Sequence, residues 1–86
     1  MPTISYFYGI SIRMFLDDHA PPHFHASYGG FTATIDIQAL KLLKGELPRR
    51  ALELVLDWAE LHQKELLHNW ELCHQWIAPN RIDPLT

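Results

Sequence analysis

The chain has 86 residues, of which 48% are hydrophobic and 20% are charged, and its formal net charge is −3. This length and composition are those of one folded domain with a single modest core, and they exclude a multidomain protein. The slightly negative charge excludes binding to nucleic acid through a global basic field, so such a contact needs a local patch. The single cysteine, Cys73, excludes an internal disulfide and a multi-cysteine zinc site.

One domain is therefore predicted over residues 1–86. The sequence opens without a secretory leader, and its apolar runs are far shorter than the roughly 18 residues of a membrane span. The lone cysteine fits a reducing compartment. We expect a soluble cytoplasmic protein that has no membrane partner.

The first predicted strand is "GISIRMFLDD", in which apolar and polar residues alternate as in a half-buried strand. The strand stops in the segment 17–22, where two prolines without amide donors forbid a central strand. The side chains expected to face the core are Ile10, Ile12, Met14 and Leu16.

Two further strands, "HFHASY" and "FTATIDI", flank Gly29 and Gly30, which suit a primed hairpin turn. With these glycines as the loop, His23 pairs with Asp36 across the hairpin. A shift of one residue would mix the polar and apolar faces, so the buried face specifies this register. The predicted apolar face consists of Phe24, Ala26, Tyr28, Phe31, Ala33 and Ile35, and the predicted polar face contains His23, His25, Ser27, Thr32, Thr34 and Asp36.

The segment "LKLLKGE" is ambiguous and fits a short fourth strand. From Leu47 the apolar spacing becomes helical as far as about Trp76, and Pro48 suits the first helical position. One bent helix, or two helices that meet near residues 62–64, would explain this length. We therefore predict an α+β fold, in which an antiparallel sheet of three to four strands packs on a long C-terminal helix or on two helices.

The polar face of the hairpin predicts acid–base chemistry. His23 and His25 lie on one side of a strand, and imidazoles can act as general acid and general base near neutral pH. Asp36, opposite His23, or Asp17 would orient a ring, and Arg13 on the same face would bind a phosphate. This arrangement favours metal-independent cleavage of an RNA phosphodiester.

Two other interpretations of the same face remain open. A His-x-His pair presents two nitrogens to one ion, and Asp17, Asp36 or His19 would complete a site of two histidines and one carboxylate, with His23, His25 and Asp17 as the first choice. An antiparallel sheet can also simply expose a polar face without any chemistry. We expect no stoichiometric metal and no other cofactor, because such a site is open and binds weakly.

Arg49 and Arg50 lie in the first turn of the predicted helix, where cations oppose the helix dipole. They are candidates to bind a phosphate or an acidic partner together with the free amides of that turn. Pairing with Glu46 and Glu53 is the alternative explanation. The helical region also carries more apolar side chains than a small sheet can cover, as a partner-binding helix would.

These motifs resemble the small prokaryotic domain-of-unknown-function family 4160. The resemblance rests on "MPTIS", "GISIRMFLDDHAPPHFHASYG", "IDI", "GELPRRALELVLDWAELH" and "ELLHNWEL", and above all on "PPHFHA" followed by "LPRRAL". It implies a toxin of a type II toxin–antitoxin module, whose partner is a second small protein of domain-of-unknown-function family 2442. The positions to which it points are Asp17, Asp18, His19, His23, His25, Arg49 and Arg50.

Our leading hypothesis is a growth-inhibiting toxin that acts on RNA and forms a hetero-oligomer with a small protein antitoxin. The alternative is a module without catalysis, which binds its partner protein through the helix or holds a metal weakly.

Overall fold

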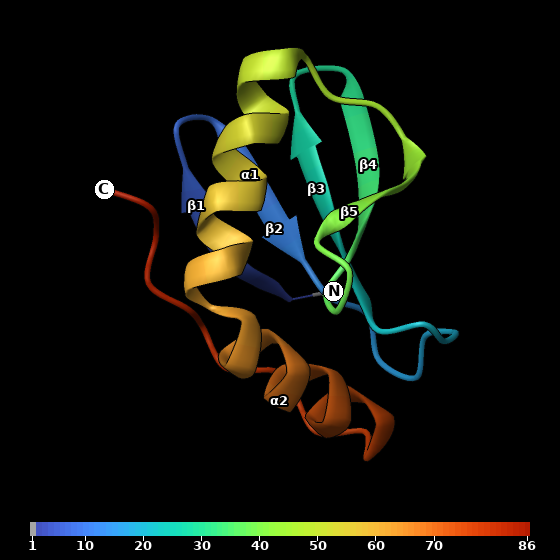
Figure 1. Cartoon of the computed structure of the whole chain (residues 1–86). Helices are drawn as coiled ribbons and strands as arrows, with labels where there is room; N and C mark the ends of the chain where they lie inside the picture. Colours follow the sequence, from blue (N-terminus) through green and yellow to red (C-terminus); the bar gives the residue numbers. More distant parts are fainter. Residues whose placement is uncertain (1) are drawn as a thin grey trace.

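The computed structural model describes residues 2–86. An antiparallel sheet with its strands in chain order is followed by two helices and an extended C-terminal segment (Figure 1). The predicted α+β fold is confirmed, with five strands rather than three or four. The elements are β1 (Thr3–Phe7), β2 (Ile10–Arg13), β3 (His23–Tyr28), β4 (Phe31–Asp36), β5 (Lys41–Gly45), α1 (Arg49–Leu61) and α2 (Gln63–His74).

β1 is the strand that the sequence pattern did not predict. Its pairing with β2 shifts register between Thr3 and Ser5, and Ile4 and Ser5 are both buried. A bulge of this kind breaks the alternation by which a strand is recognised. Tyr8 and Gly9 both have positive φ angles and join β1 to β2 as a two-residue hairpin turn.

The predicted register of the β3–β4 hairpin is confirmed at every pair, from His23 opposite Asp36 to the turn. Gly29 has a φ of 58°, as a primed turn requires. Four side chains of the predicted apolar face, those of Phe24, Ala26, Ala33 and Ile35, are buried. Tyr28 and Phe31, beside the turn, are instead 38% and 41% exposed. Leu16 was predicted to face the core together with Ile10, Ile12 and Met14. It lies beyond the end of β2 and is instead 39% exposed.

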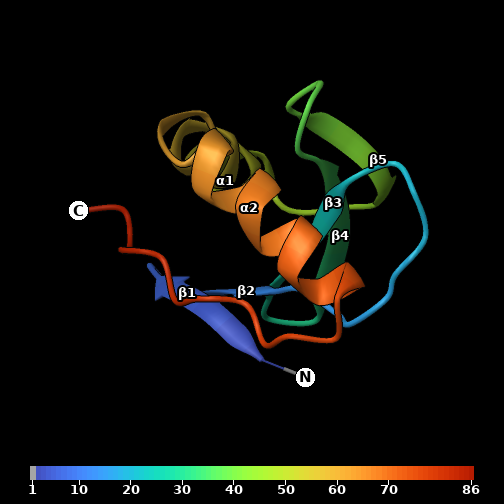
Figure 2. The ribbon, with the colours of Figure 1, turned by 90° about the horizontal axis from the view of Figure 1, so that it is seen from below.

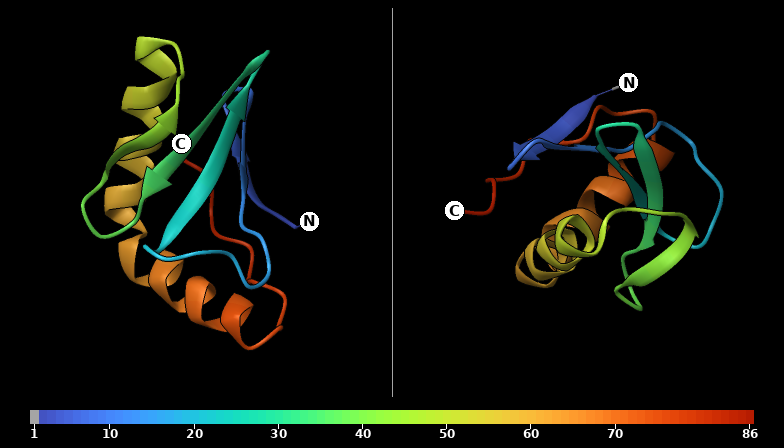
Figure 3. Two further views of the ribbon diagram at one scale, coloured as in Figure 1. Left: turned by 90° about the vertical axis from the view of Figure 1, so that its right-hand side faces the viewer. Right: turned by 90° about the horizontal axis from the view of Figure 1, so that it is seen from above.

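α1 lies along the apolar face of the sheet (Figures 1 and 3). Its Trp58 is fully buried and contacts Phe7 and Phe24, with ring centroids 5.3 and 5.7 Å apart. Pro48 was predicted to be the first residue of the helix. It is instead the N-cap, and the helix begins at the next residue, Arg49. The helical pattern belongs to two helices that meet at His62, which is the second of the two predicted arrangements. Neither helix of residues 2–86 combines the length and apolarity needed to cross a membrane.

The C-terminal segment lies beside β1 and the helices (Figure 2). The amide of Ile82 donates to the carbonyl of Ile4 at 2.8 Å, and Nε1 of Trp58 donates to the carbonyl of Asp83. Asn69 of α2 exchanges two hydrogen bonds with the backbone of Asn80. One edge of the sheet is thus covered by the chain itself.

β5 forms the other edge of the sheet, and the ambiguous segment after Leu40 is therefore a strand. All five of its residues are exposed. β5 carries two lysines, Lys41 and Lys44, and its pairing with β4 contains a register shift. Both features discourage pairing of this edge with another chain.

Candidate functional site

Two histidine rings and one carboxylate meet at the start of β3. Nε2 of His23 lies 2.9 Å from Oδ2 of Asp18, and Nε2 of His25 lies 3.1 Å from the same oxygen. The two rings stand edge to face, with centroids 5.1 Å apart. We call Asp18, His23 and His25 the carboxylate–histidine cluster.

The histidines are placed by strand pairing, and Asp18 is placed by a loop. His23 and His25 point to the same side of β3 because side chains alternate along a strand. The loop between β2 and β3 runs next to the end of α2 (Figures 1 and 2), where the amide of Asp17 donates to the carbonyl of Cys73 at 3.1 Å. This contact holds the loop so that Asp18 faces the rings.

The two rings differ in their surroundings. His23 is only 8% exposed, and its ring lies against Trp70 of α2 at 5.1 Å between centroids. Its Nδ1 is 2.7 Å from the carbonyl oxygen of Pro21, which can only accept, so Nδ1 donates. The side chain of His25 is 27% exposed and packs on Phe15 at 4.2 Å. His25 is therefore the histidine that a ligand can reach.

The carboxyl group of Asp18 favours its charged form. Partial burial opposes ionisation, but hydrogen bonds from His25, from the amide of His19 and from His23 outweigh it, together with the positive charge that His23 can carry. These contacts lower the pKa of Asp18 below its ordinary value. The cluster thus holds an anionic carboxylate against two imidazoles.

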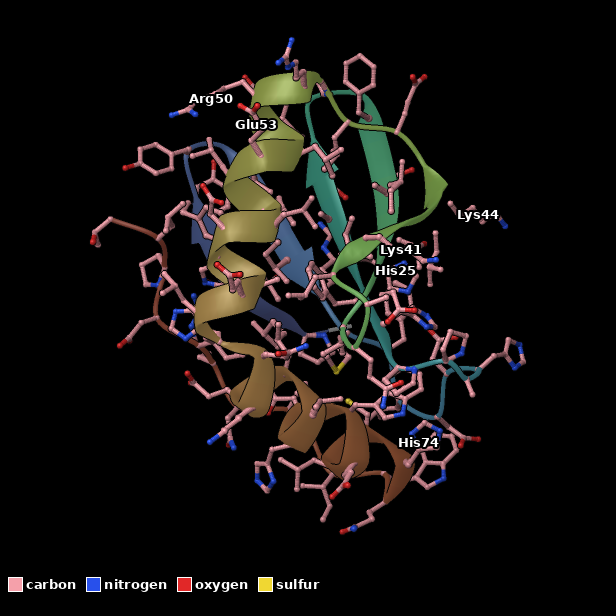
Figure 4. The ribbon with its side chains drawn as sticks, in the orientation of Figure 1. His25, Lys41, Lys44, Arg50, Glu53 and His74 are labelled. Atoms are coloured by element: carbon pink, nitrogen blue, oxygen red, sulfur yellow. The ribbon has the colours of Figure 1, made fainter. Side chains whose placement is uncertain are left out.

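A hollow of about 340 Å³ lies beside His25 on the polar side of β3, β4 and β5. Figure 4 shows His25 and Lys44 on this side of the sheet. Arg13 pairs with His25 across β2 and β3, so its side chain shares that face. The residues that line the hollow are His25, Thr32, Ala33, Thr34, Lys44 and Gly45. An anion in the hollow would meet an imidazole and an ammonium group.

The carboxylate of Asp36 binds backbone amides, and in the described residues no hydrogen bond joins it to a histidine ring. Asp36 is the cross-strand neighbour of His23, but its Oδ1 accepts hydrogen bonds from the amides of Gln38 and Ala39 at 2.8 and 2.9 Å. These bonds stabilise the turn after β4. In the described residues, the carboxylate that contacts both rings is Asp18.

The structure also separates the other predicted residues from the cluster. Asp17 and His19 are exposed on the loop and contribute only backbone amides to the contacts described above. Arg49 and Arg50 lie at the start of α1, each 3.7 Å from Glu53. Figure 4 shows Arg50 and Glu53 far from His25. These arginines are therefore not part of the hollow. Of the alternative pairing with Glu46 and Glu53, the contacts with Glu53 are present, and the described residues show none with Glu46.

Two residues of the site were missed by reasoning from pattern and spacing. Asp18 lies in a loop, where no periodicity indicates direction, and only the family resemblance pointed to it. Lys44 lies on β5, whose sequence pattern is ambiguous between strand and loop. Once β5 is placed beside β4, Lys44 pairs with Thr34, which in turn pairs with His25.

Cys73 is not a candidate nucleophile. Its side chain is fully buried, and burial raises the pKa of the thiol. A thiol that stays protonated is a poor nucleophile.

A search of the curated proteins and of the solved structures finds no match to this chain. The family model described as Domain of unknown function (DUF4160) matches residues 9–71, which include β2 to β5, α1 and the carboxylate–histidine cluster. Because this match covers most of the sequence, the chain belongs to the DUF4160 family.

Proposed function

We propose that this protein is a growth-inhibiting toxin that cleaves RNA by acid–base chemistry at His25 and is neutralised by a small protein antitoxin. The observation that carries the reaction is the contact of 3.1 Å between Nε2 of His25 and Oδ2 of Asp18, beside a hollow that also contains Lys44. The toxin role rests on the family resemblance, and the reaction rests on this geometry.

The proposed reaction uses the two nitrogens of His25 differently. Nε2–H donates to Asp18, which leaves the lone pair on Nδ1, and no described residue forms a hydrogen bond with that atom. Nδ1 takes the proton of a ribose 2′-hydroxyl, and the 2′-oxygen attacks the adjacent phosphorus to form a cyclic phosphate. The 5′-oxygen leaves with a proton from water, and the resulting hydroxide takes the proton back from the His25 imidazolium. Asp18 stabilises the imidazolium that forms, as a carboxylate does in a catalytic triad.

Cations on the same face stabilise the charge that develops on the phosphoryl oxygens. Lys44 lines the hollow, and Arg13 is the cross-strand neighbour of His25. Fixed positive groups at the position where negative charge develops contribute strongly to rate.

His23 takes a different part from the predicted one. Both of its ring nitrogens already face oxygen atoms, and the ring is nearly buried under Trp70. It cannot present a proton to a substrate in this conformation. We assign His23 as a positioning residue that holds Asp18 toward His25.

Cleavage of a labelled RNA by purified protein, in the presence of a chelator, tests the reaction. His25→Ala should reduce the rate by about 100-fold or more, which is the usual contribution of a general base. Asp18→Asn should also reduce the rate, mainly through kcat. His68→Ala is the matched control, because His68 is exposed on α2 and lies outside the hollow. Equal cleavage by the wild type and His25→Ala would refute the assignment.

Growth of a host that lacks the partner protein tests the toxin role. Wild-type protein should arrest growth, and co-expression of the small protein of family 2442 should restore it. The double variant His23→Ala/His25→Ala should not arrest growth. Equal arrest by the wild type and the double variant would remove the histidines from the mechanism.

A module without catalysis is the second candidate, because large apolar side chains are exposed around the helices. Leu61 is 69% exposed and Trp76 is 67% exposed. If neither the wild type nor the double variant arrests growth, while the partner still binds in a pull-down, this second function is supported. Trp76→Ala should then weaken that binding.

A further inference from the structure

We propose that Asp18, His23 and His25 bind one divalent transition-metal ion, and that the bound ion prevents His25 from acting as a base. A ligand atom from each of the three residues lies within 4.8 Å of the other two. This inference goes beyond the proposed function, because it concerns binding at these side chains and not turnover.

The hydrogen bond of His23 to Pro21 aims a lone pair into the cluster. The proton sits on Nδ1, because the Pro21 carbonyl only accepts. The other nitrogen of a neutral ring, Nε2, then carries a lone pair that faces Oδ2 of Asp18 at 2.9 Å. Two acceptors at this distance require a cation beside them, either a proton or a metal ion.

Metal-binding histidines in proteins usually show this arrangement. They donate their second ring nitrogen to a carbonyl or carboxylate, and this contact fixes the tautomer and the direction of the ring. The carbonyl of Pro21 supplies that contact to His23 at 2.7 Å. The packing of Trp70 on His23 and of Phe15 on His25 restrains both rings further.

Oδ2 of Asp18 brings the ligands together. It lies 2.9 Å from one Nε2 and 3.1 Å from the other. Neighbouring ligands of an ion with bonds of about 2.1 Å are separated by roughly 3.0 to 3.4 Å, so both oxygen-to-nitrogen distances are close to those of a shared ion. The proposal departs from the expectation of no stoichiometric metal, because the loop turns Asp18 inward and Asp18 takes the place of Asp17 as the third ligand.

The donor set indicates the class of ion. Imidazole nitrogens suit zinc, copper, iron and nickel, and a site of two histidines and one carboxylate leaves coordination positions open. The single anionic ligand, Asp18, offsets part of the charge of a divalent ion. Zn²⁺ and Co²⁺ are therefore suitable probes.

Metal binding and the proposed catalysis require opposite tautomers of His25. Catalysis needs the proton on Nε2, so that it donates to Asp18, and the lone pair on Nδ1. When an ion binds to Nε2, the proton of the neutral ring is on Nδ1. Nδ1 then has no free lone pair and cannot accept the proton of a hydroxyl group. An occupied site is therefore inactive as a base.

Titration of Zn²⁺ into the untagged, chelator-treated full chain tests the inference by calorimetry. We expect one ion per chain and a loss of affinity of about 10-fold or more in Asp18→Asn, since even indirect contacts to a metal ligand are worth about 10- to 100-fold. Asp17→Asn changes the neighbouring exposed carboxylate in the same way and should bind like the wild type. No binding by the wild type, or equal binding by the two Asn variants, would overturn the site.

A second variant and a spectroscopic measurement distinguish loss of metal binding from unfolding of the chain. His23→Gln alters a nearly buried residue and can unfold the chain, so His25→Gln, at the more exposed ring, provides the decisive histidine test. The wild type with Co²⁺ should show ligand-field absorption that His25→Gln lacks, while circular dichroism shows both to be folded. Equal spectra would contradict the assignment.

The metal test and the ribonuclease test can fail separately. Zn²⁺ binding needs no RNA, so the site stands if the protein cleaves nothing. If the protein cleaves RNA but binds no Zn²⁺, only the metal site is refuted. If both hold, saturating Zn²⁺ should abolish the cleavage that is seen with chelator.

Discussion

Gly45 illustrates how a single residue closes the sheet beside the hollow. Its φ is 78°, and a Cβ atom placed on it would lie 2.2 Å from the carbonyl oxygen of Thr32. The amide of the next residue, Glu46, donates to that same carbonyl, so the two backbones cannot move apart freely. The position therefore requires glycine.

Gly45→Ala should lower the free energy of unfolding by more than about 2 kcal/mol, from the positive φ and the backbone clash together. Urea denaturation followed by tryptophan fluorescence measures this change. Gly30→Ala is the matched control, because a Cβ there meets no atom within 4 Å. Equal effects of the two substitutions would show that the close approach to Thr32 is not a constraint.

At the residue scale, the histidines of the site could be predicted and the carboxylate could not. His23 and His25 lie in a strand whose alternation and turn fix the side of the sheet to which each ring points. The direction of Asp18 depends on a loop that is held by the contact of Asp17 with the end of α2. That contact joins residues 56 positions apart in sequence, and no local pattern encodes it.

At the scale of elements, the C-terminal segment completes the sheet. Ile82 is 4% exposed, and its amide pairs with Ile4 at the outer edge of β1. An uncovered edge strand would offer its backbone groups to other chains. Covering this edge with the chain's own segment leaves β5 as the open edge, and that strand carries two lysines.

Ile82→Ala should destabilise the protein by roughly 2 to 5 kcal/mol, as other large-to-small changes at buried positions do. Thermal denaturation followed by circular dichroism measures the loss. Asp83→Ala is the control, because Asp83 is exposed and uses only its backbone carbonyl to bind Trp58. A change at Ile82 no larger than at Asp83 would mean that the segment does not pack on the core in solution.

The predicted elements differ in how fully the sequence encoded them. The β3–β4 hairpin was predicted pair by pair, because one register alone separates its apolar from its polar side chains. β1 was missed because its bulge buries two consecutive residues, Ile4 and Ser5. The break between the helices at His62 was only one of two options, since the apolar stripe continues across it.

At the scale of the whole molecule, the carboxylate–histidine cluster joins three parts of the fold. Asp18 comes from the loop after β2, the histidines come from β3, and α2 contributes Trp70 against His23. The site therefore also contributes to stability, and its ionisation should be visible in the unfolding of the whole chain.

The free energy of unfolding should depend on pH through Asp18. Burial opposes its ionisation, but the hydrogen bonds from His25, the His19 amide and His23 lower its pKa in the folded protein below the ordinary value of 3.8. The unfolded chain then binds this proton at higher pH than the folded chain does. The stabilisation is complete above 3.8 and is lost as the pH falls through the lower folded value.

The difference in unfolding free energy between the wild type and Asp18→Asn should therefore be largest above about pH 5 and should shrink steadily below about pH 4. Urea denaturation at a series of pH values measures this difference. Asp57→Asn, on the exposed side of α1, controls for the loss of one negative charge. The amide of Asn keeps an oxygen that can accept a hydrogen bond but carries no charge, so the pH-dependent part isolates the charged carboxylate. A difference that stays constant, or that grows as the pH falls, would show that the rings do not hold Asp18 in its ionised form.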